Sequence, residues 1–395
     1  MADLLFKNVR LMQPGEGIAG TWLLAVDGKI ADFGEGEGPS GERTTDATFV
    51  EGNGRLLTPG LIDVHTHGVG RHGYDFGPEA IAEGSRLLPK YGVTTFLPTL
   101  VPKTEEDWFV HLESLAGTLD RLEGATAPGF HLEGPFLALT GAACETVPGD
   151  LDLLARFRKC LKNKLAVMSI SPETEHILPV IEKLREEGAV PFITHTKANA
   201  PQTEAAVEAG ARHGTHFYDV FYVPDETELG VRPVGAVEVL LADPRCTVDF
   251  ICDGAHVAPV VIRMAVRAKG YENVIAITDS NIGAGMPEGV YDTPWGYPMR
   301  VQHNNGARIH DPNHPYNGAL AGSELTMDRA VNNLRKWLDL PDDQIWAMAT
   351  RNPARLLRMA HKGVIRKGAD ADLVLWGEEG GEYAVEGCWV GGRKT

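Results

Sequence analysis

The chain has 395 residues, a formal net charge of −17 and 43% hydrophobic residues. This length suits one large domain with a small second one, and the composition is that of a globular protein with a sizeable core. The acidic charge disfavours nucleic acids and anionic membranes as partners, and the lack of an apolar run of about 18 residues disfavours a membrane span.

Both ends of the chain predict short β-strands. Apolar runs broken by turn residues fill the first 58 residues, where Asp27-Gly28-Lys29 is typical of a hairpin turn. Residues 361–395 repeat this pattern. We therefore predict a small β-sandwich domain that residues 1–58 and 361–395 build together.

Residues 59–360 alternate between two kinds of segment. Short apolar runs are mostly separated by amphipathic stretches of helical length, such as PEAIAEGSRLLPKYG and PETEHILPVIEKLREEG. Strands that alternate with helices form a parallel sheet, and eight of them predict a closed (β/α)8 TIM barrel. An open doubly wound sheet is the alternative, which the lack of a GxGxxG sequence after the first strand disfavours. The eight predicted strands are LIDVHTH, GVTTFLPTL, PGFHLEG, LAVMSIS, VPFITHT, GTHFYDV, TVDFICDG and NVIAITDS.

The first predicted barrel strand ends in two histidines. His65 and His67 are two residues apart, so both side chains point to the same face of the strand, which in a barrel is the interior. Both imidazoles can then reach one metal ion. An HxH pair taken alone is more often a surface or hydrogen-bonded pair, but this one ends a strand and is followed by Gly68.

Four further strands end in side chains that can bind a metal. Each has an ordinary interpretation when taken alone: a loop glutamate, a satisfied core histidine or a capping aspartate. Together they mark the carboxyl ends of the strands, where barrel enzymes have their active sites. We therefore predict a site of imidazoles and carboxylates without thiolate, which suits zinc, iron, manganese, cobalt or nickel. The residues are Glu133, His195, His216 and Asp279.

Two other histidines are not expected to bind the metal. His131 shares the strand face of Glu133 and is predicted to support the site from behind. His213 is placed before its strand and is a poor candidate.

The five cysteines and the N-terminus bear on location. The cysteines form no CxxC pair and their number is odd, which predicts free thiols in a reducing compartment. The segment MADLLFKNVRLMQPG has no basic stretch followed by an apolar run, so no signal peptide is predicted. We therefore expect a cytoplasmic location.

Several longer motifs lie between about Pro59 and Asp372. They include PGLIDVHTHG, HLEGPFL, DGAHVAP, ITDSNIGAG and KGADADLV. These motifs resemble the amidohydrolase superfamily, and HLEGPFL and DGAHVAP resemble its N-acetylglucosamine-6-phosphate deacetylase family in particular. Strand four does not end in the lysine that many superfamily members carboxylate, so Glu133 is the expected substitute, as in the deacetylases.

This resemblance implies a division of the metal ligands. Glu133, His195 and His216 would hold the principal ion, and His65 with His67 would hold a second one. One or two divalent ions are therefore expected, with zinc as the first choice.

The resemblance also implies which residues meet the substrate. Asp279 matches the catalytic aspartate, which takes a proton from the attacking water and returns it to the leaving amine. His256 matches a histidine that contacts the substrate. Arg232 matches an arginine that meets the phosphate, reaching in from the partner subunit of a homodimer. The expected reaction converts N-acetylglucosamine 6-phosphate to acetate and glucosamine 6-phosphate.

Some segments depart from the deacetylase pattern. Asp219 stands where the family has a phosphate-binding asparagine, and a carboxylate there repels a phosphate dianion by about 1 kcal/mol or more at close range. The segment ELGVRPVGAV lacks the usual Arg-Glu-Pro-Gly, and the usual Gly-Ala-His reads Gly141-Ala142-Ala143. The segment TPWGYPMRVQHNNGARIHDPNHPYNG is longer than its counterpart. The resemblance therefore predicts the type of reaction better than it predicts the substrate.

Two other functions stay open. The first is hydrolysis of a different amide, such as an unphosphorylated N-acyl amino sugar, a cyclic imide or an N-acyl amino acid, and Asp219 favours it. The second is a barrel that has lost catalysis and serves as a binding scaffold. The presence of every expected ligand and of Asp279 disfavours the scaffold.

Overall fold

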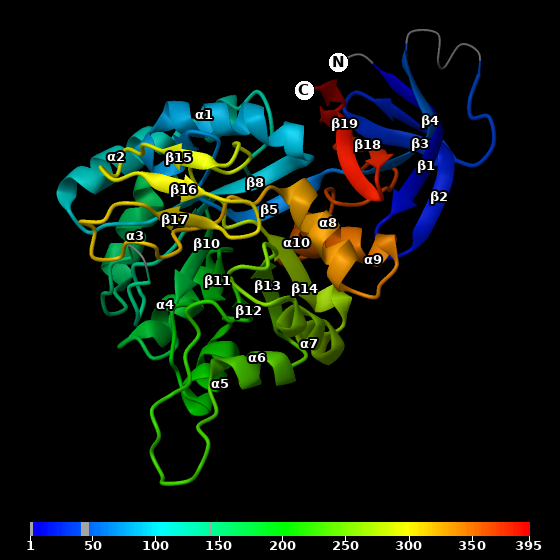
Figure 1. Cartoon of the computed structure of the whole chain (residues 1–395). Helices are drawn as coiled ribbons and strands as arrows, with labels where there is room; N and C mark the ends of the chain where they lie inside the picture. The colour runs from blue at the N-terminus through cyan, green and yellow to red at the C-terminus, as the bar shows by residue number, and fades with distance from the viewer. Residues whose placement is uncertain (1–2, 41–46, 142–143) are drawn as a thin grey trace.

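The computed structural model describes residues 3–40, 47–141 and 144–395. Two large sheets organise the chain: an eight-stranded barrel in the middle of the sequence and a seven-stranded sheet made from both ends (Figure 1). Among the described residues, no helix has the length and apolar character needed to cross a bilayer.

The barrel sheet contains all eight predicted strands, in chain order. Neighbouring strands pair in parallel, from β5 through β8 to β14. The first and last strands approach each other, because the backbone nitrogen of Asp279, just after β14, donates to the oxygen of His65 in β5 at 2.9 Å. The predicted (β/α)8 barrel is thereby confirmed. The strands are β5 (Leu61–Thr66), β8 (Val93–Leu100), β9 (Phe130–Leu132), β10 (Leu165–Ile170), β11 (Val190–Ile193), β12 (His213–Gly214), β13 (Thr247–Ile251) and β14 (Val274–Ile277).

Alternation along these strands separates two apolar cores. One buried cluster contains Ile62, Val64 and Ile275. It also contains Ala354, in the helix at residues 351–356, and Met359, which follows that helix. Their neighbours of opposite parity, such as Leu61 and Val274, belong to the larger cluster shared with the surrounding helices. Because successive side chains of a strand point to opposite faces, one apolar run fills both the barrel interior and the layer outside it.

The helices surround the barrel (Figure 1). The two amphipathic stretches quoted from the sequence, residues 78–92 and 172–188, contain helices α1 and α4, as predicted. Helix α5 begins with a capping box, in which Asn199 and Gln202 each accept from the other's backbone nitrogen. The helices are α1 (Pro78–Leu87), α2 (Glu106–Ala116), α3 (Leu151–Cys160), α4 (Ile177–Glu186), α5 (Ala200–Ala209), α6 (Ala236–Ala242), α7 (Pro259–Lys269), α8 (Met327–Trp337), α9 (Asp342–Ala349) and α10 (Arg351–Leu356).

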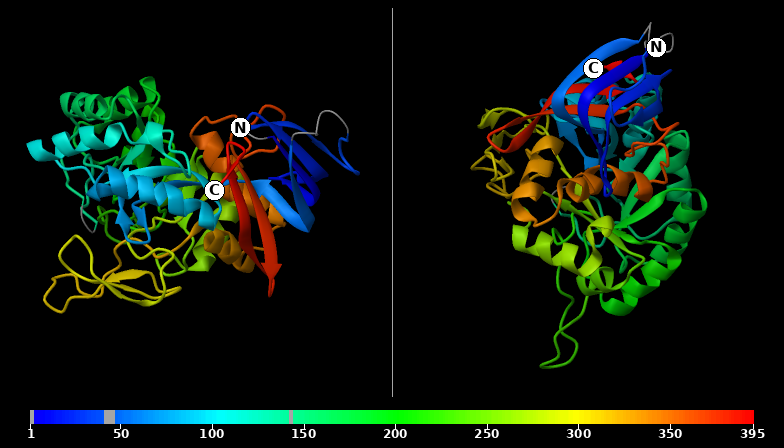
Figure 2. Two further views of the ribbon diagram at one scale, coloured as in Figure 1. Left: turned by 90° about the horizontal axis from the view of Figure 1, so that it is seen from above. Right: turned by 90° about the vertical axis from the view of Figure 1, so that its right-hand side faces the viewer.

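The two ends of the chain build one β domain together, as predicted, and its strands form one seven-stranded sheet (Figure 2). Strand β18 pairs antiparallel with β4, which joins the C-terminal strands to the N-terminal ones. A buried cluster that includes Phe6, Leu57 and Trp389 lies within this domain. Only Gly60 separates β4 from β5, close to the predicted boundary between residues 58 and 59. Both predicted domain boundaries stay predictions. The strands are β1 (Leu4–Gln13), β2 (Gly17–Val26), β3 (Lys29–Gly34), β4 (Thr48–Pro59), β18 (Leu373–Glu379), β19 (Glu382–Val390) and β20 (Arg393–Lys394).

Two small sheets follow the first and last barrel strands. The hairpin of β6 (Gly68–Val69) and β7 (His72–Gly73) comes directly after His67. Strands β15 (Gly289–Tyr291), β16 (Met299–Val301) and β17 (Ala307–Ile309) form a meander, and β16 and β17 belong to residues 293–318, the segment expected to be longer than its family counterpart. A Cβ added to Gly306, in this meander, would lie 3.7 Å from Cε1 of His256. The longer segment therefore lies beside a predicted substrate-binding residue.

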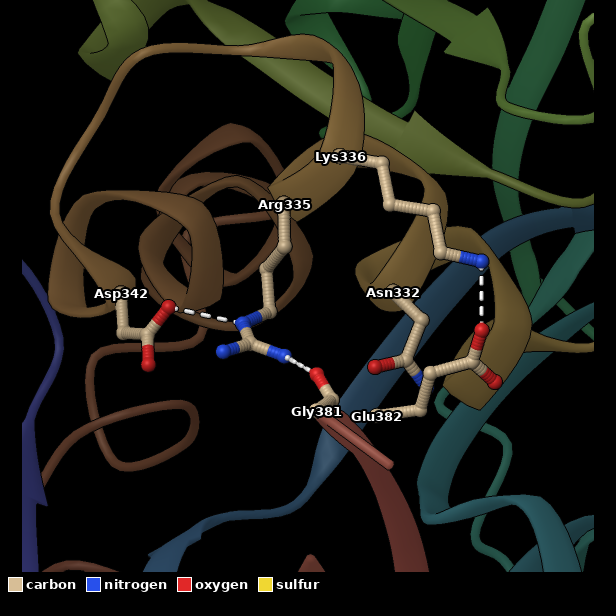
Figure 3. Close-up of a pocket in the computed structure, with 6 residues that line it drawn as sticks. All are labelled: Asn332, Arg335, Lys336, Asp342, Gly381 and Glu382. Carbon is tan, nitrogen blue, oxygen red and sulfur yellow. Dashed lines mark hydrogen bonds and ion pairs between the residues drawn. The ribbon is translucent and has the colours of Figure 1, made fainter. Parts of the chain in front are cut away.

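A polar cavity of about 160 Å³ lies where α8 and α9 meet the turn before β19 (Figure 3). Its side chains are already paired. Nε of Arg335 lies 2.8 Å from Oδ1 of Asp342, its Nη1 donates to the oxygen of Gly381 at 2.9 Å, and Lys336 pairs with Glu382. These contacts join the barrel to the terminal sheet.

Candidate functional site

The six residues predicted at the strand ends lie together at the carboxyl-terminal mouth of the barrel. They come from five strand ends, and each is at most 9% exposed. This burial is costly for carboxylates and imidazoles unless they are paired or bind a cation. The residues are His65, His67, Glu133, His195, His216 and Asp279.

Glu133 lies at the centre of this cluster. Its Oε1 atom is 3.0 Å from Nε2 of His216 and 3.3 Å from Nε2 of His195. Its Oε2 atom is 3.1 Å from Nε2 of His67. One carboxylate therefore faces imidazoles from three separate strand ends.

The second part of the cluster contains the HxH pair. Oδ1 of Asp279 is 3.3 Å from Nε2 of His67 and 3.6 Å from Nε2 of His65. One donor atom from each of these three residues lies within 4.8 Å of the others. The same holds for His65, Glu133 and His216, so His65 lies between two possible ion positions.

The rings of His195 and His216 are oriented so that Nε2 faces Glu133. Nδ1 of His195 donates to the carbonyl oxygen of Leu139 at 3.0 Å, and Nδ1 of His216 lies 3.2 Å from the carbonyl oxygen of Asp219. A carbonyl only accepts, so these contacts place the ring proton on Nδ1. Nε2 of each ring then faces Glu133 and is the ligand atom that the ring would offer to a cation.

His65 is oriented by a chain of two buried residues. Its Nδ1 is 2.9 Å from Oγ1 of Thr215, and that hydroxyl donates to Oδ2 of Asp249 at 2.9 Å. Thr215 must therefore accept the proton of His65 Nδ1. Sequence analysis missed both supporting residues, although an aspartate inside the apolar strand β13 was a usable signal.

Two atoms in the cluster have no hydrogen-bond partner among the described residues. They are Nε2 of His65 and Oδ1 of Asp279, and both are buried. An unpaired buried acceptor costs free energy, and a divalent cation between these atoms would satisfy both. The cluster thus fits a metal ion.

The charges in the cluster support the same conclusion. Burial alone would raise the pKa of Glu133, but hydrogen bonds from His195, His216 and the HxH pair hold it well below its usual value. Burial would lower the pKa of His216, yet its hydrogen bond to Glu133 and the charge of that residue raise it to about 10. The site therefore carries an ionised carboxylate ready to pair with positive charge.

Left-handed backbone occurs at three of these strand ends. His195, His216 and Asp279 have φ values of 48°, 34° and 45°, and Tyr218 and Val220 follow with 77° and 54°. Left-handed backbone is unusual for residues other than glycine, and for the β-branched Val220 it is a true outlier. Such strain persists where the surrounding structure holds the chain in a functional conformation.

The predicted substrate-binding residues are placed differently from one another. His256 lies near the mouth, and its Nδ1 is 2.7 Å from Oδ2 of Asp253. Burial lowers its pKa, but the hydrogen bond and charge of Asp253 and the charges of Asp219 and Asp279 raise it above the usual value. Arg232 is 79% exposed and pairs with Glu238 at 2.9 Å, so within this chain it does not reach the cluster.

The two histidines set aside at the sequence level lie behind the cluster. Nδ1 of His131 lies 3.2 Å from the oxygen of Val64 and its Nε2 lies 2.9 Å from Oγ of Ser169. His213 lies in β12 rather than before it, and its Nε2 lies 2.8 Å from Asp249. Neither belongs to a candidate metal group among the described residues.

One residue near the cluster was not expected. The thiol of Cys144 forms a possible metal group with Glu133 and His195, whereas the sequence predicted a site without thiolate. A single cysteine outside any spaced motif offered no signal for this. The family's Gly-Ala-His position falls partly on residues 142–143, which lie outside the described residues.

Comparisons with known proteins agree with this geometry. The model of the amidohydrolase family matches residues 56–393.

The chain belongs to the amidohydrolase family.

Similar proteins place it more closely among the deacetylases. An N-acetylglucosamine-6-phosphate deacetylase from Lysinibacillus sphaericus is 32% identical over 94% of this chain and 93% of that protein. An N-acetylgalactosamine-6-phosphate deacetylase from Escherichia coli O157:H7 is 29% identical over 88% and 89%. The structure of a mutant N-acetyl-D-glucosamine-6-phosphate deacetylase from Mycobacterium smegmatis, in complex with N-acetyl-D-glucosamine-6-phosphate, has a TM-score of 0.85 at 26% identity, covering 100% and 99%. The resemblance expected from the motifs is confirmed.

Membership in the amidohydrolase family shows which type of reaction the protein catalyses. This amidohydrolase is a hydrolase of amide C–N bonds, and its family generally binds divalent metal. The cluster around Glu133 is where the chain offers the donors for such an ion.

Proposed function

We propose that this amidohydrolase is a metal-dependent N-acetylglucosamine-6-phosphate deacetylase, which releases acetate and glucosamine 6-phosphate. The observation that carries the proposal is the convergence of imidazoles on Glu133 beside the buried Asp279. The names of the similar proteins support the choice of substrate class.

The proposed metal ligands are those expected from the sequence. Glu133, His195 and His216 would hold one ion, and His65 with His67 a second, with zinc as the first choice. When bound, such an ion lowers the pKa of a water molecule and polarises a carbonyl oxygen.

Asp279 is proposed as the general base and then the general acid. Burial raises its pKa, but the charge of His65 and the hydrogen bond and charge of His67 lower it overall, so the carboxylate is ionised at neutral pH. It can therefore take a proton from the attacking water. An amide nitrogen leaves poorly without a proton, so Asp279 returns this proton to the departing amine.

His256 is proposed to hold the acetamide carbonyl. Asp253 anchors its Nδ1 at 2.7 Å and favours the protonated ring. Nε2 is then a donor in a largely buried position at the mouth. A donor placed there stabilises the negative charge that develops on the carbonyl oxygen.

A deacetylation screen tests the proposal. Metal-reconstituted protein is assayed for acetate release from N-acetylglucosamine 6-phosphate, N-acetylgalactosamine 6-phosphate and the two free sugars. We expect the highest kcat/KM on N-acetylglucosamine 6-phosphate. Absence of acetate release from every sugar would reject the deacetylase and leave hydrolysis of a different amide or the scaffold.

Asp219 favours a second candidate, a deacetylase of unphosphorylated or differently acylated amino sugars. Its charge acts on both His216 and His256, so it lies close to the substrate position. A phosphate dianion near this carboxylate loses about 1 kcal/mol or more. If this candidate is correct, Asp219→Asn raises kcat/KM for the phosphorylated sugar and leaves kcat/KM for the free sugar nearly unchanged. An equal change in kcat/KM for both sugars would reject this candidate.

The chain is also proposed to act as a cytoplasmic homodimer, in which Arg232 serves the partner's site. The loop before α6 carries Arg232 and exposes apolar side chains, among them Leu229 at 96%. Mixing the inactive variants Arg232→Gln and Asp279→Asn tests this, because mixed dimers would contain one intact site and regain partial activity. No recovery in mixtures shown to exchange subunits would reject the shared site.

A further inference from the structure

Cys144 is the one cysteine whose thiol belongs to a possible metal group among the described residues. Its Sγ, one oxygen of Glu133 and one nitrogen of His195 all lie within 4.8 Å of one another, and all three residues are buried. The cysteines Cys160, Cys246, Cys252 and Cys388 are also buried and free, yet they belong to no such group there. Burial alone therefore does not account for the position of Cys144.

The turn that carries Cys144 is packed directly on a proposed metal ligand. The backbone nitrogen of Cys144 donates to the oxygen of Thr140 at 2.9 Å, and the carbonyl of Leu139 accepts from Nδ1 of His195 at 3.0 Å. Gly141 has φ 54°, and a Cβ there would lie 2.2 Å from Cε1 of His195. Any larger side chain at this position would therefore collide with the imidazole of His195.

An independent feature shows that the cluster is built to hold a cation. Nε2 of His65 is fully buried and has no hydrogen-bond partner among the described residues, although its ring is held by Thr215. This nitrogen lies 3.7 Å from Oε1 of Glu133. The carboxylate that faces Cys144 thus also faces an unsatisfied ligand atom.

We propose that Cys144 is a thiolate ligand of the ion held by Glu133 and His195. Ligation forms one sulfur–metal bond and releases the thiol proton to solvent, with no change of oxidation state. A thiolate among imidazole and carboxylate ligands favours soft or borderline ions such as zinc and cadmium over manganese. The inference rests on the proposed metal site and adds a ligand to it.

Cobalt substitution tests this ligand without relying on turnover. A thiolate bound to Co²⁺ gives a strong near-ultraviolet charge-transfer band, whereas imidazole and carboxylate ligands do not. We expect this band in the wild-type protein and in Cys160→Ser, a matched control at a buried cysteine of α3. It should be absent in Cys144→Ser, and competition with a chelator should show metal affinity at least about tenfold lower in that variant.

X-ray absorption of the zinc-loaded wild-type protein provides a test that needs no variant. We expect one sulfur scatterer at about 2.3 Å from zinc, besides nitrogen and oxygen at about 2.0–2.1 Å. A shell of nitrogen and oxygen alone, or a cobalt band that persists in Cys144→Ser, would overturn the ligand. Acetate release is measured on the same samples to separate this inference from the proposed function. If the protein releases acetate but its metal has no sulfur ligand, the proposed role of Cys144 is wrong and the proposed function still stands.

Discussion

At the scale of single residues, Glu133 sets the character of the site. Its two oxygens face His195, His216 and His67 at 3.0–3.3 Å, while each of the first two rings has its other nitrogen at a backbone carbonyl. The imidazoles are thereby oriented before any ligand arrives. Preorganised ligands of this kind bind a metal without the entropy cost of ordering them.

Asp279→Asn separates metal binding from proton transfer. The amide keeps the size of the side chain but cannot take a proton, so we expect the ion of Glu133, His195 and His216 to be retained and turnover to be at least about a hundredfold lower. Metal analysis and steady-state assays of the same preparation measure both quantities. Turnover close to wild type would remove Asp279 from its proposed role.

Thr215→Val tests the support of His65. The substitution removes the hydroxyl that lies between Nδ1 of His65 and Asp249. Loss of a partner behind a metal-binding histidine typically lowers metal affinity about 10–100-fold, and we expect that range here. Chelator competition measures it, with Thr203→Val in α5 as the control for a buried threonine elsewhere. Equal affinity in both variants would show that Thr215 has no positioning role.

At the scale of elements, the meander of β15–β17 is anchored by a buried charge. Glu324 is fully buried, and it accepts from the backbone nitrogen of Asn304 at 3.2 Å and from Nη2 of Arg329 at 3.0 Å. This anchor holds the turn whose Gly306 lies beside His256. Residues 293–318 are therefore tied to the side of the barrel where the substrate is expected.

Arg329→Met should weaken this anchor. The carboxylate of Glu324 loses its charged partner while staying buried, which costs about 1–3 kcal/mol in the free energy of unfolding. Urea unfolding measures the change. Arg55→Met, at an exposed pair with Glu386, is the control and should change stability by about 1 kcal/mol or less. A double variant with Glu324→Gln should recover part of the loss, and no recovery would contradict the pairing.

At the scale of the whole molecule, a cation would join strand ends that are far apart in the sequence. His65 follows from β5, Glu133 from β9 and His216 from β12, and one ion can contact all three. Because the unfolded chain does not present these atoms together, metal binding stabilises the folded state.

Metal removal should therefore lower the melting temperature and abolish deacetylation. At a free metal concentration a thousand times Kd, linkage contributes about 4.1 kcal/mol of stability. Calorimetry of chelator-treated and zinc-reconstituted protein measures the shift, and magnesium, which prefers oxygen ligands, should not reproduce it. An unchanged melting temperature after verified zinc binding would contradict a site formed by folding.

Much of the fold follows from local patterns. The alternation of apolar runs and amphipathic stretches predicts the eight barrel strands, since each segment carries its own periodicity. His65, Glu133, His195, His216 and Asp279 could be identified because parallel strands of a barrel bring their carboxyl ends to one face. The sequence by itself therefore determined the barrel, the terminal β domain and the candidate metal ligands.

Tertiary structure alone decided the neighbours that come from loops and strand interiors. Cys144 reaches the cluster because a turn closes on His195, and Asp249 supports His65 through Thr215 across three strands. Arg232 pairs with Glu238 on an exposed loop instead of joining the cluster. Loop conformation and contacts between distant strands depend on packing across the whole barrel, so no spacing within the sequence encodes them.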